Sequence, residues 1–282
     1  MLSLLQLNVW LDAIFTNLYP IIVLALMGHF IGNILTGRAK RRFGREWAWP
    51  HHDSHPPLLP KFLHFTHVAC MFILGATGLM IRFNPISRET MQWLHYIAMI
   101  IVTINLIWRL WYAFSSRQRD YREFAITQQD IVTAPKVILY YIFVKPSKPH
   151  LGKYNVMQKG TYTIFVPLLI IQAITGFMLW RLQIPIADMS LQELFAGLIG
   201  ATGIWWTRTI HYVINWLFII LTTIHVYLSV TEDFPAFLDF FGLGGFDKRS
   251  AAKHGGGHGD DHGDDHGHAH EPATAYASAE HG

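Results

Sequence analysis

The sequence contains little charge and almost no cysteine. Only 15% of its 282 residues are charged, while 51% are hydrophobic. Soluble globular proteins average about 25% charged residues, so this composition excludes an ordinary soluble domain. The single cysteine, Cys70, excludes an internal disulfide, a cysteine-ligated iron–sulfur cluster within this chain and the C-x-x-C-H motif that attaches c-type haem. Any redox cofactor must therefore be held noncovalently or belong to a partner.

Long apolar runs dominate the sequence instead. A bilayer core about 30 Å thick needs roughly 20 apolar residues for each helical crossing. Five segments meet this requirement, at about 11–36, 61–83, 92–114, 161–181 and 209–230. The first lacks a basic leader and is too long for a signal peptide, so we expect it to remain as a helix. The predicted fold is an all-α integral membrane helical bundle, a four-helix core with one extra N-terminal transmembrane helix.

The basic residues are distributed unevenly among the connections. Five lie in 37–46, eight in 115–160 and three follow the last helix, whereas the N-terminus and the opposite loops hold only Arg82, Arg88, Arg181 and Arg208. Positively charged loops stay in the cytoplasm. The sequence therefore predicts a multi-pass protein of the inner (cytoplasmic) cell membrane, with the N-terminus and the loops 84–91 and 182–208 outside and the C-terminus inside.

Composition divides the chain into three predicted parts. Residues 1–59 hold the extra helix and a basic cytoplasmic loop, and 60–247 hold the four-helix core. The tail, 248–282, is rich in Gly, Asp and His and contains seven of the 17 histidines, so we expect it to be disordered. Such a tract either binds zinc, nickel or copper loosely or is simply solvated. Within the core, 115–160 is expected to be an amphipathic cytoplasmic loop, and 183–207 to lie along the outer surface.

Two histidines in the last apolar segment raise the question of a cofactor. An α-helix advances 100° and 1.5 Å per residue, so the fourteen residues from His211 to His225 return to within about 40° of one face, about 21 Å further along. Ionisable groups inside a membrane need a partner. By depth, His95 can meet His211 near the outer surface and His64 can meet His225 near the inner surface.

Two opposed imidazoles are what a six-coordinate b-type haem requires, and apolar helices supply its pocket. Zinc is less favoured because no carboxylate or thiolate clusters with either pair. Histidines that merely hydrogen-bond between helices are the remaining alternative. The prediction is two haem b groups, with His64, His95, His211 and His225 as axial ligands of the iron. Gly78 and Gly176, each in a Thr-Gly pair, leave room for either a flat cofactor or a packed helix.

Other polar residues are weaker candidates. His67 could replace His64 as a ligand, His29 lies in a small-xxx-small motif typical of packing, and His51, His52 and His55 form a solvated turn or a proton route to a quinone. Arg82 or Arg208 outside, and Lys61 or Arg109 inside, could bind haem propionates or anchor the helix ends. Asn105 and Gln172 could bind quinone or form interhelical hydrogen bonds.

Several motifs over about 60–240 resemble a known family. FLHFTHVACMFILGATG, LHYIAMIIVTINLIWRLWYAF, KPHLGKYNVMQK, and the IHY and HVY triplets followed by Glu232-Asp233 are similar to the b-type cytochrome subunit of membrane-bound nickel–iron hydrogenases. That family is related to the cytochrome subunits of formate dehydrogenase and of thiosulfate reductase. Helix 11–36 and the tail depart from its four-helix pattern.

The resemblance implies an electron-transfer subunit that does not itself activate hydrogen. Its expected partners are the hydrogenase small and large subunits, quinone and the lipid bilayer, with no nucleic acid. The implied path runs from the enzyme through the His95–His211 haem and the His64–His225 haem to quinone. The alternatives are the cytochrome subunit of a formate dehydrogenase or a thiosulfate or polysulfide reductase, a divalent-metal transporter or sensor, and a haem-free anchor.

Overall fold

The computed structural model describes residues 4–43, 58–83, 87–116, 120–147, 156–184 and 188–243. The histidine-rich tail and the group His51, His52 and His55 lie outside these residues. Within the described ranges the regular structure is helical except for one short antiparallel strand pair, β1 (Gln183–Ile184) with β2 (Met189–Ser190). The predicted all-α class is confirmed.

Five helices are long and apolar enough to cross a membrane, which confirms the predicted number of spans. They are α1 (Leu4–Leu35), α3 (Leu58–Phe83), α4 (Arg88–Ser115), α6 (Val156–Met178) and α7 (Leu191–Glu232). The first four begin three to seven residues before the predicted starts, because amphipathic residues at a helix end extend it beyond the apolar run. As a result His64 and His95 lie in the second turn of their helices.

Helix α7 begins 18 residues before the predicted start at 209. Its first turn is fixed by a capping box, in which the Ser190 hydroxyl accepts from the Glu193 N–H and the Glu193 carboxylate accepts from the Ser190 N–H. The helix is interrupted at Gly200, whose φ of 72° and ψ of 173° are not helical. Glycine adopts this conformation without steric cost, so residues 191–199 form a helical piece separate from the long helix that follows Gly200.

Three short helices lie between spans, α2 (Arg38–Phe43), the 3-10 helix η1 (Asp120–Phe124) and α5 (Gln128–Tyr141), and a fourth, α8 (Phe234–Phe240), follows the last span. Helix α5 occupies part of the region predicted as an amphipathic loop. A capping box of Thr127 and Asp130 starts it, and it buries Val137 and Tyr140. This region is therefore packed onto the spans.

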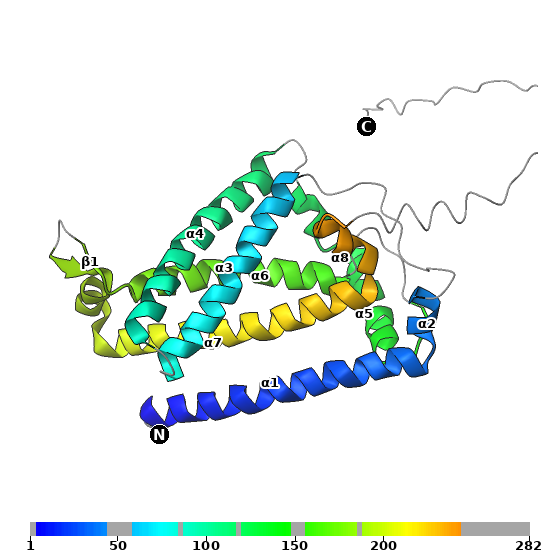
Figure 1. Ribbon diagram of the computed structural model, residues 1–282, viewed down its shortest axis with the longest axis horizontal. Helices are drawn as coiled ribbons and strands as arrows, with labels where there is room; N and C mark the ends of the chain where they lie inside the picture. The colour runs from blue at the N-terminus through cyan, green and yellow to red at the C-terminus, as the bar shows by residue number, and fades with distance from the viewer. Residues whose placement is uncertain are drawn as a thin grey trace, which may run out of the picture. The chain divides into compact units, whose positions relative to one another are not determined.

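Neighbouring spans pack as two pairs, α3 with α4 and α6 with α7, and α1 runs beside α7 (Figure 1). The contact of α1 with α7 is aromatic, because Phe15 stacks on Trp216 with ring centroids 5.6 Å apart and meets Tyr212 edge-on. Most other large apolar side chains of α1 face outward, as expected for a helix that contacts lipid on most of its surface.

Candidate functional site

A cavity of about 410 Å³ lies between α3, α4, α6 and α7. Its volume is within the range of about 300–1,000 Å³ that is usual for cofactor pockets. We name it the arginine-rich cavity; its lining residues are Gly78, Ile81, Arg82, Arg88, Gln92, His95, Tyr96, Met99, Gly176, Leu179, Arg181, Gln192, Arg208, His211, Tyr212 and Asn215.

His95 of α4 and His211 of α7 meet at this cavity. Their ring centroids are 6.3 Å apart and the rings are inclined at 63°. The two residues are 116 positions apart in sequence, yet the structure brings together the pair that the sequence analysis placed at one depth. Both rings are half-buried and line the cavity between these helices.

Each of these histidines is held by a threonine from the preceding helix. His95 Nδ1 lies 2.8 Å from the Thr77 hydroxyl, and His211 Nδ1 lies 2.9 Å from the Thr175 hydroxyl. Both hydroxyls donate their own hydrogen to a carbonyl four residues earlier, at 2.6 and 2.8 Å. Each hydroxyl must therefore accept from an Nδ1–H, which leaves Nε2 unprotonated and able to bind a metal.

The glycine that follows each threonine provides space beside the imidazole. A Cβ atom added to Gly176 would lie 3.2 Å from Met99 Sδ and 3.3 Å from His211 Cε1, closer than ordinary contact. At Gly78 the nearest atom would be His95 Cε1, at 3.6 Å. The two Thr-Gly pairs therefore build the same feature twice, a hydroxyl on the ring nitrogen and bare backbone beside the ring. A flat prosthetic group fits such a cradle.

Four arginines line the cavity, and their charge is mostly uncompensated. Within the part of the chain that the structure describes, Arg82 alone of the four has a carboxylate partner, Asp12 of α1, at 2.8 and 2.9 Å. Arg208 is close enough to Arg88 and Arg181 for mutual repulsion. Clustered cations beside a cavity favour an anionic ligand, and carboxylates are the groups that guanidinium binds best. Haem, with its two propionates, meets both requirements of the cavity.

The second predicted pair lies at the opposite end of α7. His225 is in α7 and His64 in α3, and His225, His67 and Arg109 are close enough to His64 to interact with it electrostatically. The ring of Phe240 in α8 lies 5.2 Å from the His64 ring. The structure therefore brings His64 near His225, and the His64 ring also contacts an aromatic side chain of the short final helix.

Two polar residues considered for quinone form interhelical hydrogen bonds instead. Asn105 of α4 donates to the Leu63 carbonyl at 2.9 Å and lies 3.4 Å from His67 Nδ1. Gln172 of α6 lies 3.2 Å from His211 Nε2 through its amide nitrogen, which donates to that unprotonated atom. Both of their side-chain oxygens are buried without a hydrogen-bond partner among the described residues.

The cationic candidates divide between the two ends. Arg82 and Arg208 line the arginine-rich cavity, as expected for propionate partners. Lys61 is engaged elsewhere, since its Nζ donates to the main-chain carbonyl and the carboxylate of Asp239 at 2.9 and 3.2 Å. Arg109 lies near His64.

Sequence reasoning missed several residues of the cavity, including Thr77 and Thr175 as hydrogen-bond partners and Arg88 and Arg181 as lining groups. A signal for the threonines was present in the repeated Thr-Gly pair, of which only the glycine was interpreted. Arg88 and Arg181 were interpreted only as markers of topology, whereas Arg82 and Arg208 were also predicted to bind propionates.

Residues 55–241 match the prokaryotic cytochrome b561 family. The chain belongs to that family. It is also similar to a protein of Azospira oryzae (strain ATCC BAA-33 / DSM 13638 / PS) named as YedZ1, a subunit of a protein-methionine-sulfoxide reductase, with 27% identity over 175 residues that cover 56% of this chain and 81% of the relative. The protein is therefore a multi-pass membrane cytochrome that binds haem b, transfers electrons and works with redox enzyme subunits.

Proposed function

We propose that this cytochrome holds two haem b groups, one between His95 and His211 and one between His64 and His225, and passes electrons between a membrane-bound redox enzyme and quinone. The observation that carries the proposal is the arginine-rich cavity, where two imidazoles have Nδ1 bonded to a threonine and Nε2 available. For the second pair the support is the proximity of His64 and His225.

The protein's own residues have separable tasks in this proposal. Haem supplies the one-electron chemistry when bound. Thr77 and Thr175 orient the imidazoles and keep Nε2 unprotonated. The arginines of the cavity would hold the propionates, and Gln172, which donates to His211 Nε2, would give up this hydrogen bond to the haem iron. His67, which is bonded to Asn105, is proposed to stay outside the ligand set.

The proposed orientation follows the basic residues, with the arginine-rich cavity at the outer surface, the His64–His225 pair at the inner surface and the C-terminus in the cytoplasm. The enzyme that exchanges electrons would then dock outside, and quinone would react near the inner end. The membrane proposed is the inner cell membrane.

Two partner enzymes are supported by different observations. The motifs of α3, α4 and α7 resemble those of hydrogenase cytochromes, which favours the large and small subunits of a nickel–iron hydrogenase. The relative named as a methionine-sulfoxide reductase subunit favours a reductase instead. Affinity purification of the tagged full chain from its native membrane, followed by a hydrogen-dependent and a sulfoxide-dependent haem redox assay, separates the two.

The haem proposal is tested by measuring haem content and spectrum. The purified full chain should contain about two haem b per polypeptide, His211→Ala and His225→Ala should each retain one, and His67→Phe should retain both. The absorption spectra of His211→Ala and His225→Ala should differ from each other, because each variant lacks a different haem. A colourless protein that binds zinc would instead support metal transport; among the described residues no group of three or more metal-binding side chains is found.

A further inference from the structure

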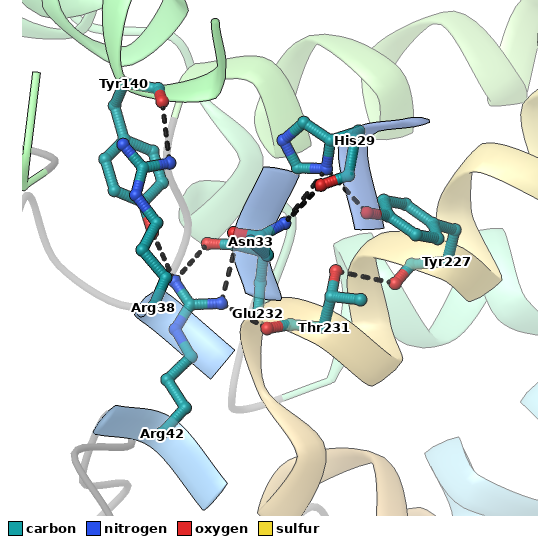
Figure 2. Close-up of polar contacts among 8 residues, drawn as sticks. All are labelled: His29, Asn33, Arg38, Arg42, Tyr140, Tyr227, Thr231 and Glu232. Atoms are coloured by element: carbon teal, nitrogen blue, oxygen red, sulfur yellow. Dashed lines mark hydrogen bonds and ion pairs between the residues drawn. The ribbon is translucent and has the colours of Figure 1, made fainter. Parts of the chain in front are cut away.

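A second polar cluster lies where the C-terminal part of α1 meets α2, α5 and α7 (Figure 2). We name it the α1–α7 polar cluster; its residues are His29, Asn33, Arg38, Arg42, Tyr140, Tyr227, Thr231 and Glu232. His29, Asn33, Arg38 and Arg42 come from α1 and α2, which precede the region that matches the family. These four residues therefore lie outside the part of the chain that matches the family and pack onto it.

The hydrogen bonds at His29 fix which ring nitrogen carries the proton. Asn33 Nδ2 donates to the His29 main-chain carbonyl at 3.1 Å, so this atom is the amide nitrogen, and it also lies 3.2 Å from His29 Nδ1. The Tyr227 hydroxyl lies 2.5 Å from the same Nδ1. Because an amide nitrogen only donates, Nδ1 must be the acceptor. The proton of the neutral ring is therefore on Nε2.

This Nε2–H is buried and makes no hydrogen bond with any residue that the structure describes. The Tyr141 main-chain carbonyl is near the ring, but it does not meet hydrogen-bond geometry with Nε2. Leaving a buried donor unsatisfied costs about 1–3 kcal/mol. The site therefore favours a ligand that brings an acceptor to this nitrogen.

Three aromatic rings contact the His29 imidazole. The ring centroids of Phe143, Tyr227 and Tyr141 lie 5.0, 5.6 and 6.1 Å from that of His29. Phe143 adopts a left-handed φ of 65°, and its ring lies so close to Gly32 that an added Cβ would be 2.5 Å away. A non-glycine residue held in this conformation is strained and is often found at functional sites. The rings offer flat apolar surfaces to a ligand.

The charges nearby are already satisfied, which determines the charge of the ligand. Glu232 is 2% exposed and forms a bidentate ion pair with Arg42, at 2.9 and 3.2 Å. Arg38 donates to the carbonyls of Tyr140 and Lys145 at 2.9 and 2.6 Å and lies 4.1 Å above the Tyr140 ring. These guanidinium groups are engaged, so the site favours a neutral ligand over an anion.

A neutral, planar molecule with a carbonyl acceptor has the chemistry of a quinone headgroup. We propose that His29 Nε2–H donates a hydrogen bond to a quinone carbonyl oxygen, with the headgroup against the rings of Tyr141, Phe143 and Tyr227. The inference rests on the proposed function, because the electrons come from the haem assigned to His64 and His225. Tyr227, which contacts His29, lies two residues beyond His225 in α7, so the site lies at nearly the same depth as that haem, on the other side of α7.

The test measures how fast quinone oxidises the haems. The full chain in detergent is reduced with stoichiometric dithionite and mixed with a short-chain benzoquinone or with menadione, and the haem absorbance is followed. His29→Leu should oxidise roughly tenfold more slowly, the effect of losing one hydrogen bond, with an unchanged haem spectrum. His29→Gln, which keeps an N–H donor, should recover most of the rate. Gly28→Ala is the control, because an added Cβ there meets nothing within 4 Å.

Different results overturn the two proposals. If the wild-type chain holds no haem, or quinone does not oxidise it, the proposed function fails. If quinone oxidises the wild type and His29→Leu at the same rate, only the assignment of His29 fails, and the Nε2–H binds water or the Tyr141 carbonyl. Should His29→Leu not accumulate, His29→Asn decides, because its shorter amide cannot reach the position of Nε2 and should be as slow as expected for leucine.

Discussion

The two ends of the bundle use charge in opposite ways. Four guanidinium groups line the arginine-rich cavity. Among the described residues, one carboxylate, that of Asp12, forms an ion pair with them, through Arg82. At the other end, three cations are each paired with a carboxylate, as Arg42–Glu232, Lys61–Asp239 and Lys159–Asp130. The comparison teaches that paired charges hold helices together, whereas unpaired charges beside a cavity indicate a ligand.

The histidines differ in a similar way. Those of the cavity are bonded to threonine hydroxyls, which accept from Nδ1, while His67 and His29 contact asparagine amides. A threonine whose hydrogen is already donated leaves Nε2 unprotonated for a metal. Asn33, a donor, places the proton of His29 on Nε2 and creates a donor instead. The residue type beside the ring therefore separates a metal ligand from a hydrogen-bonding group.

The largest expected effect comes from filling the cavity. Gly176→Val places atoms where even a Cβ would contact Met99 and His211 at 3.2–3.3 Å, so it should remove the haem of the cavity and leave about one haem per chain. Gly160→Val, in the same helix with nothing within 4 Å, should keep both. Haem content by pyridine haemochrome measures this. Two haems in Gly176→Val would show that the cavity is not the haem site.

The threonines should have the next largest effect. Thr175→Val keeps the shape of the side chain but removes the acceptor of His211 Nδ1–H, and Thr77→Val does the same for His95. Losing such a partner typically lowers the affinity for a metal by about 10–100-fold, so haem should dissociate faster into apomyoglobin. Thr103→Val is the matched control, because its hydroxyl bonds to the Met99 carbonyl of its own helix. Equal dissociation rates in all three variants would contradict the role of these threonines.

How far the sequence alone predicted these features depends on the range of the interaction. Apolar length predicted all five spans, because each crossing is set by local composition. Helical periodicity and depth placed His95 beside His211 correctly, since the spacing along a helix is fixed. The extension of α7 to Leu191 was missed because Gly200 is a weak helix former, and only tertiary packing decides that a helix resumes beyond it.

The polar contacts were harder to predict. Whether Asn105 and Gln172 face a ligand or a neighbouring helix depends on side-chain direction across two helices, which no spacing encodes. The α1–α7 polar cluster could not be predicted from the sequence for the same reason. It joins residues nearly 200 positions apart, such as His29 and Tyr227. His29 was interpreted through the glycines around it, of which Gly32 does pack tightly, against Phe143.

A smaller effect is expected from the one carboxylate beside the cavity arginines. Asp12 bonds to Arg82 and, at 2.6 Å, accepts from the Tyr212 hydroxyl. Asp12→Asn removes a negative charge, which should favour the reduced haem and raise the midpoint potential of the cavity haem by about 30 mV, or roughly 0.7 kcal/mol. Asp239→Asn, at the opposite end, should leave that potential unchanged. A redox titration in which both variants shift the same haem would contradict the assignment of Asp12 to the cavity.

The smallest effect concerns the paired end and its dependence on pH. Asp130 is 1% exposed and accepts from Lys159 Nζ and from the N–H and hydroxyl of Thr127, each at 2.8 Å. The lysine, followed by the Thr127 contacts, lowers the pKa of Asp130 from 3.8 to about 2. Because the folded pKa is the lower one, the charged carboxylate stabilises the fold above about pH 4, and this stabilisation is lost as pH falls toward 2.

Asp130→Asn should therefore lower the stability near neutral pH by about 1 kcal/mol, because the hydrogen bonds from Lys159 and Thr127 would go to a neutral acceptor in place of a charged one. It should also flatten the decline in Tm between pH 4 and pH 2 that the wild type shows in detergent. Glu89→Gln, on the exposed first turn of α4, should keep the wild-type profile. Haem content should be unchanged in both, since an ion pair that only joins α5 to α6 has no ligand to hold. If Asp130→Asn lost haem, the division between ligand-binding and structural charges would not hold at this end.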